Sequence, residues 1–205
     1  MSLYERYILP PLIHFACSRP PIQAQRRLLL PAAEGVVLEL GFGSGLNLPF
    51  YDPAKLTHLY ALEPSEGMLP RARKAAVRSG LPVTVLPETA EALSLPPASV
   101  DTVTVTFALC TIPDAVQALE GARRALKPGG RLLFLEHGLA PDAKVARNQR
   151  RLEPLWGKIA GGCHLARDIP ALIRAGGFSL DRLETGYLPQ APRFAGHVFW
   201  GAAKP

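Results

Sequence analysis

The sequence predicts a single α/β domain with a doubly wound, mostly parallel sheet and an antiparallel edge. Short apolar runs alternate with amphipathic helical segments from residue 36 to about residue 140, an order typical of a parallel sheet with crossover helices. The last two strand-like segments, residues 178–187 and 197–202, are joined by a proline-rich link without a helix, which favours antiparallel pairing. A chain of 205 residues suffices for one domain and its core, but not for a second catalytic unit.

The individual elements follow from local residue patterns. Pro10-Pro11 and Pro20-Pro21 are expected to break residues 1–35 into two short helices, because proline cannot donate a helical hydrogen bond. Further along, apolar and β-branched runs predict strands, and longer segments with charges at helical spacing predict helices. The predicted strands before residue 140 are 36–40, 58–62, 83–86, 100–107 and 131–135, and the predicted helices after residue 35 are 68–79, 114–126, 142–158 and 169–175.

Composition excludes several classes of protein. Apolar residues make up 48% of the chain and charged residues 20%, which excludes a disordered, collagen-like or coiled-coil protein. The net charge of +6 is compatible with an anionic substrate, nucleic acid or a membrane surface, and selects none of them. Residues 1–6 lack the order of a signal peptide, and three cysteines far apart do not form a disulfide framework. We therefore expect a cytoplasmic protein with reduced thiols and no integral membrane segment.

A glycine-rich run directly after the first strand is the strongest indication of a ligand site. Glycine lets the backbone turn sharply and approach a ligand, at the strand ends where parallel sheets bind one. We expect a helix to start after this run and to offer free N–H groups to an anionic group. The spacing of Gly41, Gly43 and Gly45 is G-x-G-x-G. Dinucleotide sites have the pattern G-x-G-x-x-G, and Leu46 occupies the position of its third glycine. Glu63, after the second strand, can accept hydrogen bonds from both ribose hydroxyls of a cofactor, so it does not distinguish NAD from other ribose-containing ligands.

Four segments taken together resemble the ordered motifs of class I S-adenosylmethionine-dependent methyltransferases. They are residues 37–47, 62–68, 90–101 and 126–130, which keep the order and spacing of that family. The resemblance implies a Rossmann-like methyltransferase fold, with a seven-stranded sheet whose last strand is antiparallel. It also implies S-adenosylmethionine as the cofactor and methyl transfer by in-line displacement. A cofactor-binding module without transfer activity is the alternative from another class.

The resemblance also implies cofactor contacts for individual residues. Glu39 would orient the methionine amino end, Glu63 would take the ribose hydroxyls, and Met68 would cover the adenine. Thr89 stands where the family usually has an aspartate that binds the adenine amino group, and its hydroxyl can still accept that bond. The remaining residues expected at the cofactor are Gly41, Gly43, Gly45, Asn47, Pro64, Ala90 and Thr106.

Four further segments are similar to a small-molecule branch of this superfamily that includes thiol methyltransferase-like proteins. They are residues 4–10, 46–51, 136–137 and 162–167. The resemblance implies a small organic acceptor, possibly a thiol, without naming it. The alternative within enzymes is methylation of a phospholipid headgroup or a quinone precursor at a membrane surface. A basic helix face with Lys144, Arg147 and Arg151 would suit peripheral contact with anionic lipid, or would simply be solvated.

The nature of the acceptor decides how much base catalysis is needed. A thiolate is already a strong nucleophile, whereas an oxygen or nitrogen acceptor usually needs a nearby base. The candidate bases are His137, after the fifth strand, and His164, in a glycine-rich loop. For each, the alternative is a histidine that only holds its loop. Cys110 is expected to contact the substrate, or else to be a small buried apolar residue.

The N-terminal segment is expected to close the site. Residues 1–35 form a helical lid in this interpretation, over a methyltransferase domain of residues 36–205. Tyr7 would then border the acceptor and Arg167 would meet it from the other side. The alternative is a pair of helices packed on the back of the sheet.

Two partner classes are not expected. Residues 106–109 read Thr-Phe-Ala-Leu, where enzymes that methylate nucleic-acid bases resemble one another in an Asn/Asp-Pro-Pro-aromatic motif, so no nucleic-acid partner is expected. Residues 136–138 lack the acidic cluster of metal-dependent catechol methylation, and nothing in the spacing of Cys17, Cys110 and Cys163 demands a thiophilic ligand. The sequence therefore predicts no metal site.

Overall fold

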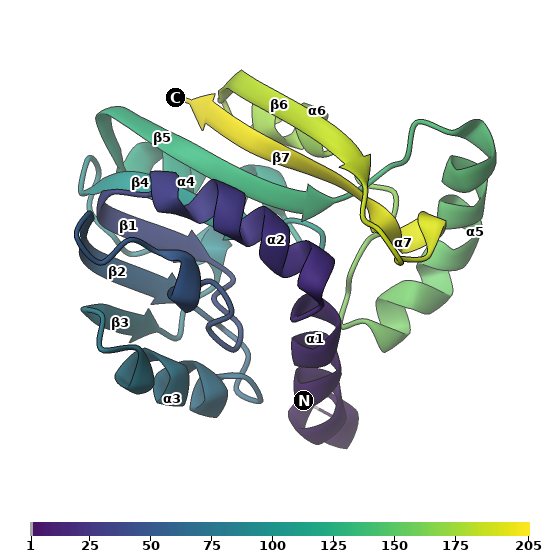
Figure 1. The fold of residues 1–205 in the computed structure, drawn as a ribbon, viewed down its shortest axis with the longest axis horizontal. Helices are drawn as coiled ribbons and strands as arrows, with labels where there is room; N and C mark the ends of the chain where they lie inside the picture. Colours follow the sequence, from purple (N-terminus) through teal and green to yellow (C-terminus); the bar gives the residue numbers. More distant parts are fainter. Residues whose placement is uncertain (1) are drawn as a thin grey trace.

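The computed structural model describes residues 2–205 and is built on one seven-stranded sheet (Figure 1). The strand order is β3-β2-β1-β4-β5-β7-β6, and only β7 runs opposite to the others. This confirms the predicted doubly wound sheet with its antiparallel edge. The strands are β1 (Gly35–Leu40), β2 (Leu56–Leu62), β3 (Val83–Leu86), β4 (Val100–Thr106), β5 (Leu126–His137), β6 (Ser179–Tyr187) and β7 (His197–Lys204).

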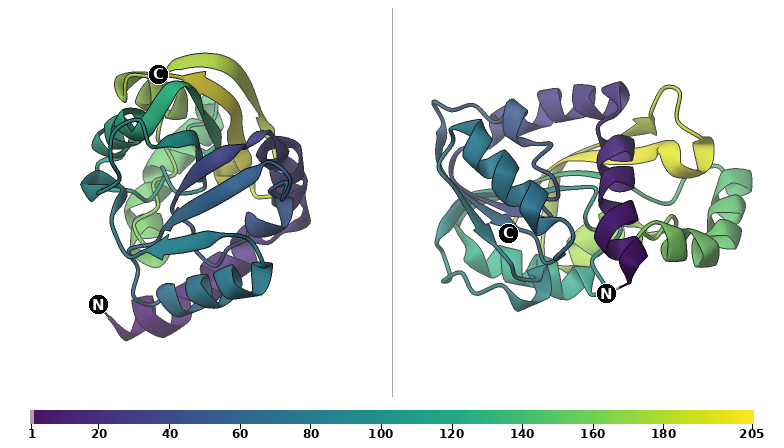
Figure 2. Two further views of the ribbon diagram at one scale, coloured as in Figure 1. Left: turned by 90° about the vertical axis from the view of Figure 1, so that its left-hand side faces the viewer. Right: turned by 90° about the horizontal axis from the view of Figure 1, so that it is seen from below.

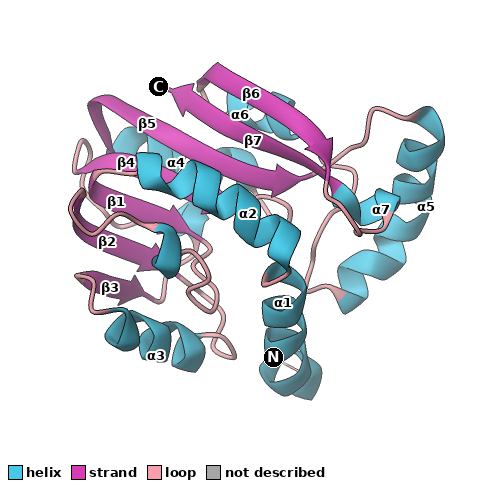
Figure 3. Ribbon diagram, viewed as in Figure 1, coloured by secondary structure: helices cyan, strands magenta, loops and turns pink. Residues whose placement is uncertain are grey.

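Helices cover both faces of the sheet, as a parallel sheet requires. On one face, helices α2 (Pro20–Leu29) and α3 (Leu69–Ser79) pack on a core that includes Leu133 and Leu135 of β5. On the other face, α4 (Ala115–Ala125) packs together with α6 (Ile169–Ala175). Figure 3 shows these layers. Helices α5 (Ala143–Ile159) and α7 (Arg193–Gly196) lie beyond the ends of the strands.

The helix expected after the glycine run is reduced to one 3₁₀ turn, η3 (Leu48–Phe50). One contact and one backbone restriction end it. Tyr51 leaves the turn with extended backbone and donates its hydroxyl to Glu39 at 2.7 Å. Pro53 disfavours helical backbone at Asp52. The expected helix N-terminus with free N–H groups is therefore wrong for this chain.

Two other boundaries differ from the prediction. Pro10-Pro11 do not break a helix, because they occupy the first turn of α1 (Leu9–Cys17), where proline has no hydrogen bond to lose. A π-helical turn, η1 (Tyr4–Ile8), runs directly into that helix. Strand β5 begins at Leu126, earlier than residue 131, through a bulged start in which Lys127 binds Asp101 at 2.8 Å.

The N-terminal segment divides into two parts with different positions. Helix α2 and the residue that follows it, Leu30, belong to the core of the sheet. In contrast, η1 and α1 project past the carboxyl ends of the strands (Figure 2). Residues 20–30 therefore pack on the sheet, as the alternative interpretation expected. Only residues 4–17 lie where a lid over the site would be. Within residues 2–205, no helix is both long and apolar enough to cross a membrane.

Candidate active site

A small cavity lies at the carboxyl ends of β1 and β4, beneath α1. Its volume is about 60 Å³. The glycine run and the end of β4 form its floor, and side chains from α1 and α2 form its roof. Six residues predicted to bind the cofactor line it: Glu39, Gly41, Gly43, Asn47, Met68 and Thr106; the other lining residues are Ile13, His14, Cys17, Arg26, Phe42, Ser44, Leu46 and Phe107.

The three glycines of the run have different surroundings. All have positive φ, at 72°, 61° and 76°. A Cβ on Gly41 would meet the Cβ of Ala108 at 2.4 Å, and one on Gly45 would meet the Cβ of Ala75 at 2.7 Å. A Cβ on Gly43 would meet nothing within 4 Å. Gly43 therefore leaves open space for a ligand, whereas Gly45 packs against α3 and does not line the cavity.

Glu63 supports the glycine run from the end of β2. Its carboxylate accepts hydrogen bonds from the backbone N–H of Gly43 and of Ser65, each at 2.8 Å. Burial raises the pKa of Glu63, although these two bonds act in the opposite direction. Each carboxylate oxygen still has a free lone pair, so Glu63 can fix the loop and accept from a ligand hydroxyl.

A buried polar network forms the wall of the cavity at the end of β1. Asn47 donates to Glu39 at 2.9 Å and to Thr106 at 3.0 Å, and its carbonyl oxygen accepts from Arg26 at 2.8 Å. Tyr51 donates to the other oxygen of Glu39. Burial raises the pKa of Glu39 to about 7, against the effect of its hydrogen bonds from Tyr51 and Asn47. Both Glu39 oxygens are therefore engaged within the protein.

Besides Gly45 and Glu63, three predicted cofactor residues do not line the cavity. Pro64 and Thr89 are exposed, and Ala90, the first residue of η4 (Ala90–Ala92), is buried in the core. They follow β2 and β3, on the same side of the sheet as Glu63. They flank the site without forming the enclosed part of it.

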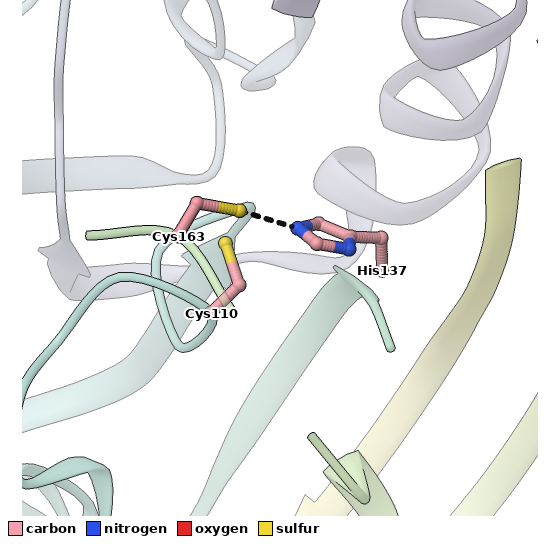
Figure 4. Close-up of side chains that lie close together, drawn as sticks. All are labelled: Cys110, His137 and Cys163. Carbon is pink, nitrogen blue, oxygen red and sulfur yellow. Dashed lines mark hydrogen bonds between the residues drawn. The ribbon is translucent and has the colours of Figure 1, made fainter. Parts of the chain in front are cut away.

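The acceptor side of the site brings together residues from β5 and from the loops after β4 and α5. Nε2 of His137 lies 3.0 Å from Sγ of Cys163, and Cys110 lies beside them (Figure 4). The His137 ring also stacks on Phe107, with 6.3 Å between ring centroids and 20° between planes. Since Phe107 lines the cavity, His137 is one ring away from it. Burial lowers the pKa of His137, but the hydrogen bond with Cys163 and the nearby Glu136 outweigh this, so the net shift is upward.

The other predicted acceptor residues are not brought together. His164 points to α5, where its Nδ1 lies 2.8 Å from Glu153, in the position of a histidine that holds its loop. Arg167 donates to the backbone carbonyls of Leu109, Ile112 and Pro113. Its guanidinium therefore holds the β4–α4 loop and does not meet Tyr7, which is 61% exposed.

Sequence reasoning missed three buried residues that shape the site. Arg26 contacts Asn47, the carbonyl of Cys17 at 2.6 Å and the face of Phe107. Glu136 accepts from the backbone N–H of Ala108 and Leu109 at 2.7 and 2.9 Å, and burial raises its pKa to about 7. Tyr51 is the third. Glu136 was named only as part of a motif, and a lone arginine in an amphipathic helix carries no indication that it will be buried.

Comparison with known proteins agrees with this geometry. Residues 38–134 match the family model of a methyltransferase domain. The thiol S-methyltransferase TMT1B of Rattus norvegicus is 33% identical, over 80% of this chain and 70% of that protein. The demethylmenaquinone methyltransferase of Thermus thermophilus is 32% identical, over 72% and 70%.

A solved structure supports the fold. An S-adenosylmethionine-dependent methyltransferase from Thermotoga maritima matches with a TM-score of 0.67, over 98% of this chain and 97% of that one, at 21% identity. The structural match at 21% identity shows the fold, whereas the two sequence relatives also show the family. The chain belongs to the class I S-adenosylmethionine-dependent methyltransferases, and it is an enzyme that uses S-adenosylmethionine.

Proposed function

We propose that this enzyme transfers the methyl group of S-adenosylmethionine to the sulfur of a small organic thiol. The observation that carries the proposal is the 33% identity with a thiol S-methyltransferase over 80% of the chain. The polar groups of the site also favour it. Glu39 has both oxygens engaged within the protein, and His137 lies behind the Phe107 ring. A thiolate acceptor needs no strong base in direct contact.

The residues at the cavity fit the cofactor. Gly43 leaves open space beside its backbone, Glu63 has free lone pairs for ribose hydroxyls, and Met68 offers an apolar surface. Arg26 brings a buried positive charge that has no carboxylate partner among residues 2–205, which suits the carboxylate at the amino-acid end of the cofactor. When bound, S-adenosylmethionine supplies a sulfonium methyl group that a nucleophile takes by in-line displacement. The protein's part is to hold both partners in line and to exclude water.

In this proposal η1 and α1 act as the lid. Helix α1 contributes Ile13, His14 and Cys17 to the cavity lining. The segment also packs against Gly67 through the carbonyl of Glu5 and against Gly161 through Leu9. His14 binds Ser44 of the glycine run at 2.7 Å. The cavity volume of about 60 Å³ is far below the roughly 300 Å³ of the smallest usual ligand pockets. We therefore expect this segment to move when a nucleoside cofactor binds.

The direct test is formation of S-adenosylhomocysteine with matched acceptors. A panel would pair each thiol with the alcohol of the same skeleton, and would add phenols and primary amines. We expect turnover with the thiols and none with the alcohols. Turnover with alcohols, phenols or amines, and none with thiols, would overturn the assignment of sulfur.

A second candidate function is methylation of a lipid-soluble acceptor at a membrane surface. Apolar side chains of the N-terminal segment are exposed: Leu3 by 78%, Phe15 by 62% and Ile8 by 57%. Tyr4 bonds to the carbonyl of Ile159, so this surface continues onto α5, where Leu155 is 62% exposed. The demethylmenaquinone methyltransferase relative is a second support.

Vesicles distinguish this candidate from the first. If it holds, the protein should float with anionic vesicles, a Leu3→Asp, Phe15→Asp double variant should not, and demethylmenaquinol in the vesicles should be methylated. Thiol turnover without any vesicle binding would exclude it.

A further inference from the structure

Three potential metal ligands from distant parts of the chain meet beside the cavity. Cys110 follows β4, His137 ends β5, and Cys163 lies in the glycine-rich loop after α5. Their side chains point toward one another (Figure 4). One ligand atom from each lies within 4.8 Å of the others, and the Nε2 of His137 is 3.0 Å from the Sγ of Cys163. All three residues are buried, with exposed fractions of 2%, 7% and 9%.

The donor atoms of this cluster have few other polar contacts. Within residues 2–205, the one hydrogen-bond partner of the His137 ring is Cys163, and its Nδ1 has none. Outside the cluster and within residues 2–205, the Sγ of Cys110 has one hydrogen-bond partner, Thr111 at 3.5 Å. All three cysteines of the chain are free thiols. Two thiols and an imidazole therefore lie together in a buried position, and the hydrogen bonds that hold the fold engage few of their polar atoms.

The backbone that carries these ligands is fixed by other residues. Glu136 holds the N–H groups of Ala108 and Leu109, and Arg167 holds carbonyls on both sides of Cys110. The backbone N–H of His164 donates to the carbonyl of Cys110 at 2.8 Å, which ties the third ligand's loop to the first. The hydrogen bonds that fix these loops therefore do not involve the donor atoms themselves. Such bonds hold the ligands in place before a metal binds, as metal sites require.

We propose that Cys110, His137 and Cys163 bind a thiophilic divalent cation of the Zn²⁺ class. Two sulfurs and one imidazole nitrogen are typical ligands of this ion, at about 2.3 Å and about 2.0–2.1 Å. Tetrahedral ligands at those lengths lie roughly 3.3–3.8 Å apart, so the three side chains need only small shifts. Binding displaces the two thiol protons to solvent, and the two thiolates balance the charge of the ion. Three protein ligands leave one position for water or another donor.

The metal proposal does not depend on which acceptor the enzyme methylates, because it rests only on the contacts among these three residues. The test therefore measures metal binding and not methyl transfer. Reduced, metal-free full-length protein would be titrated with Co²⁺, whose thiolate charge-transfer and tetrahedral bands report sulfur ligation. Zn²⁺ affinity would follow from displacement of Co²⁺ against a chelator. X-ray absorption of the Zn²⁺-loaded wild-type protein would count its sulfur and nitrogen ligands without any substitution.

The variants are C110S and C163S, with C17S as the matched control. Cys17 is the remaining cysteine and lies outside the cluster. We expect one Co²⁺ per chain in the wild type and in C17S, and affinity at least about 100-fold weaker in each of the other two. X-ray absorption should show two sulfurs and at least one imidazole nitrogen, and Zn²⁺ should raise the melting temperature of wild type and C17S only.

Three results would overturn the proposal. The first is reduced wild-type protein that gives no stoichiometric Co²⁺ bands. The second is affinity that C110S and C163S leave unchanged, with folding verified by circular dichroism. The third is a Cys110–Cys163 disulfide that forms readily in air while the reduced protein binds no metal, which would make the pair a redox couple.

Discussion

The two halves of the site are built in different ways. On the cofactor side, the glycine run and Glu63 lie within 23 residues of one another, and backbone N–H groups make the key contacts. On the acceptor side, side chains from α1, β5 and the loops after β4 and α5 converge. The cofactor side, built largely from backbone groups, suits a ligand that every reaction of the family shares. The acceptor side, built from side chains, can change its acceptor through substitutions that leave the cofactor contacts intact.

The largest effect that tests this contrast is expected at Gly43. Gly43→Val places a branched side chain in the open ligand space and should abolish S-adenosylhomocysteine binding in titration calorimetry. Gly80→Val is the matched control, because Gly80 has a similar φ of 68° and also meets nothing within 4 Å, but it ends α3 away from the cavity. Both variants should lose a similar 1–2 kcal/mol or more of stability from backbone strain. Equal loss of binding in both would show that strain, and not ligand space, is responsible.

A smaller loss is expected at Glu63. Glu63→Ala removes the acceptor of the Gly43 N–H and of the ribose hydroxyls, so it should weaken S-adenosylhomocysteine by about 1.5–3 kcal/mol, the size of a charge-assisted hydrogen bond. Glu63→Gln keeps one acceptor oxygen and should lose less. Calorimetry on folded protein measures both. Unchanged affinity in Glu63→Ala would remove this residue from the site.

On the acceptor side, Glu136 should affect stability in a pH-dependent manner. Its pKa is raised to about 7, so the folded protein holds a proton that the unfolded chain releases at about 4.5. The stability contributed by this group is present below pH 4.5 and is lost as pH rises through 7. The contribution of Glu136 to the unfolding free energy should fall by about 1–3 kcal/mol between pH 5 and pH 8. Glu136→Gln should remove this pH-dependent contribution.

The measurement for Glu136 is urea unfolding at several pH values. Glu66→Gln is the control, because Glu66 is exposed. Glu39 has a raised pKa and His197 a lowered one, and both remain in both proteins. His137 is coupled to Glu136, so the difference reports Glu136 together with its effect on the His137 pKa. A slope that Glu136→Gln leaves unaltered would contradict the raised pKa.

The smallest effect is expected in the N-terminal segment. S-adenosylhomocysteine should increase hydrogen-exchange protection in residues 4–17, because they close over the ligand, and leave α2 unchanged, because α2 is part of the core. Helix α2 thus serves as the internal control. Equal protection with and without ligand, together with full activity of a chain that lacks residues 2–17, would rule out the lid.

The cofactor half could be predicted from the sequence because its chemistry is local. Each strand is a run of buried residues, and the motif that follows it lies at the same edge of the sheet. Alternation of strands and helices therefore fixed both the fold and the position of Gly43 and Glu63. The prediction failed where a long-range contact overrode a local pattern, as when Tyr51 leaves the turn after the glycine run to bind Glu39.

By itself the sequence determined the fold class and the cofactor, and it predicted the glycine run that lines the cavity. Tertiary structure alone decided that Arg26 is buried at the cavity, that Arg167 holds a loop and that His164 pairs with Glu153. It also decided that Cys110, His137 and Cys163 meet, although 26 residues or more separate each from the next. The physical reason is that these residues act through side chains on separate elements. Their meeting depends on how the elements pack, which no spacing along one segment encodes.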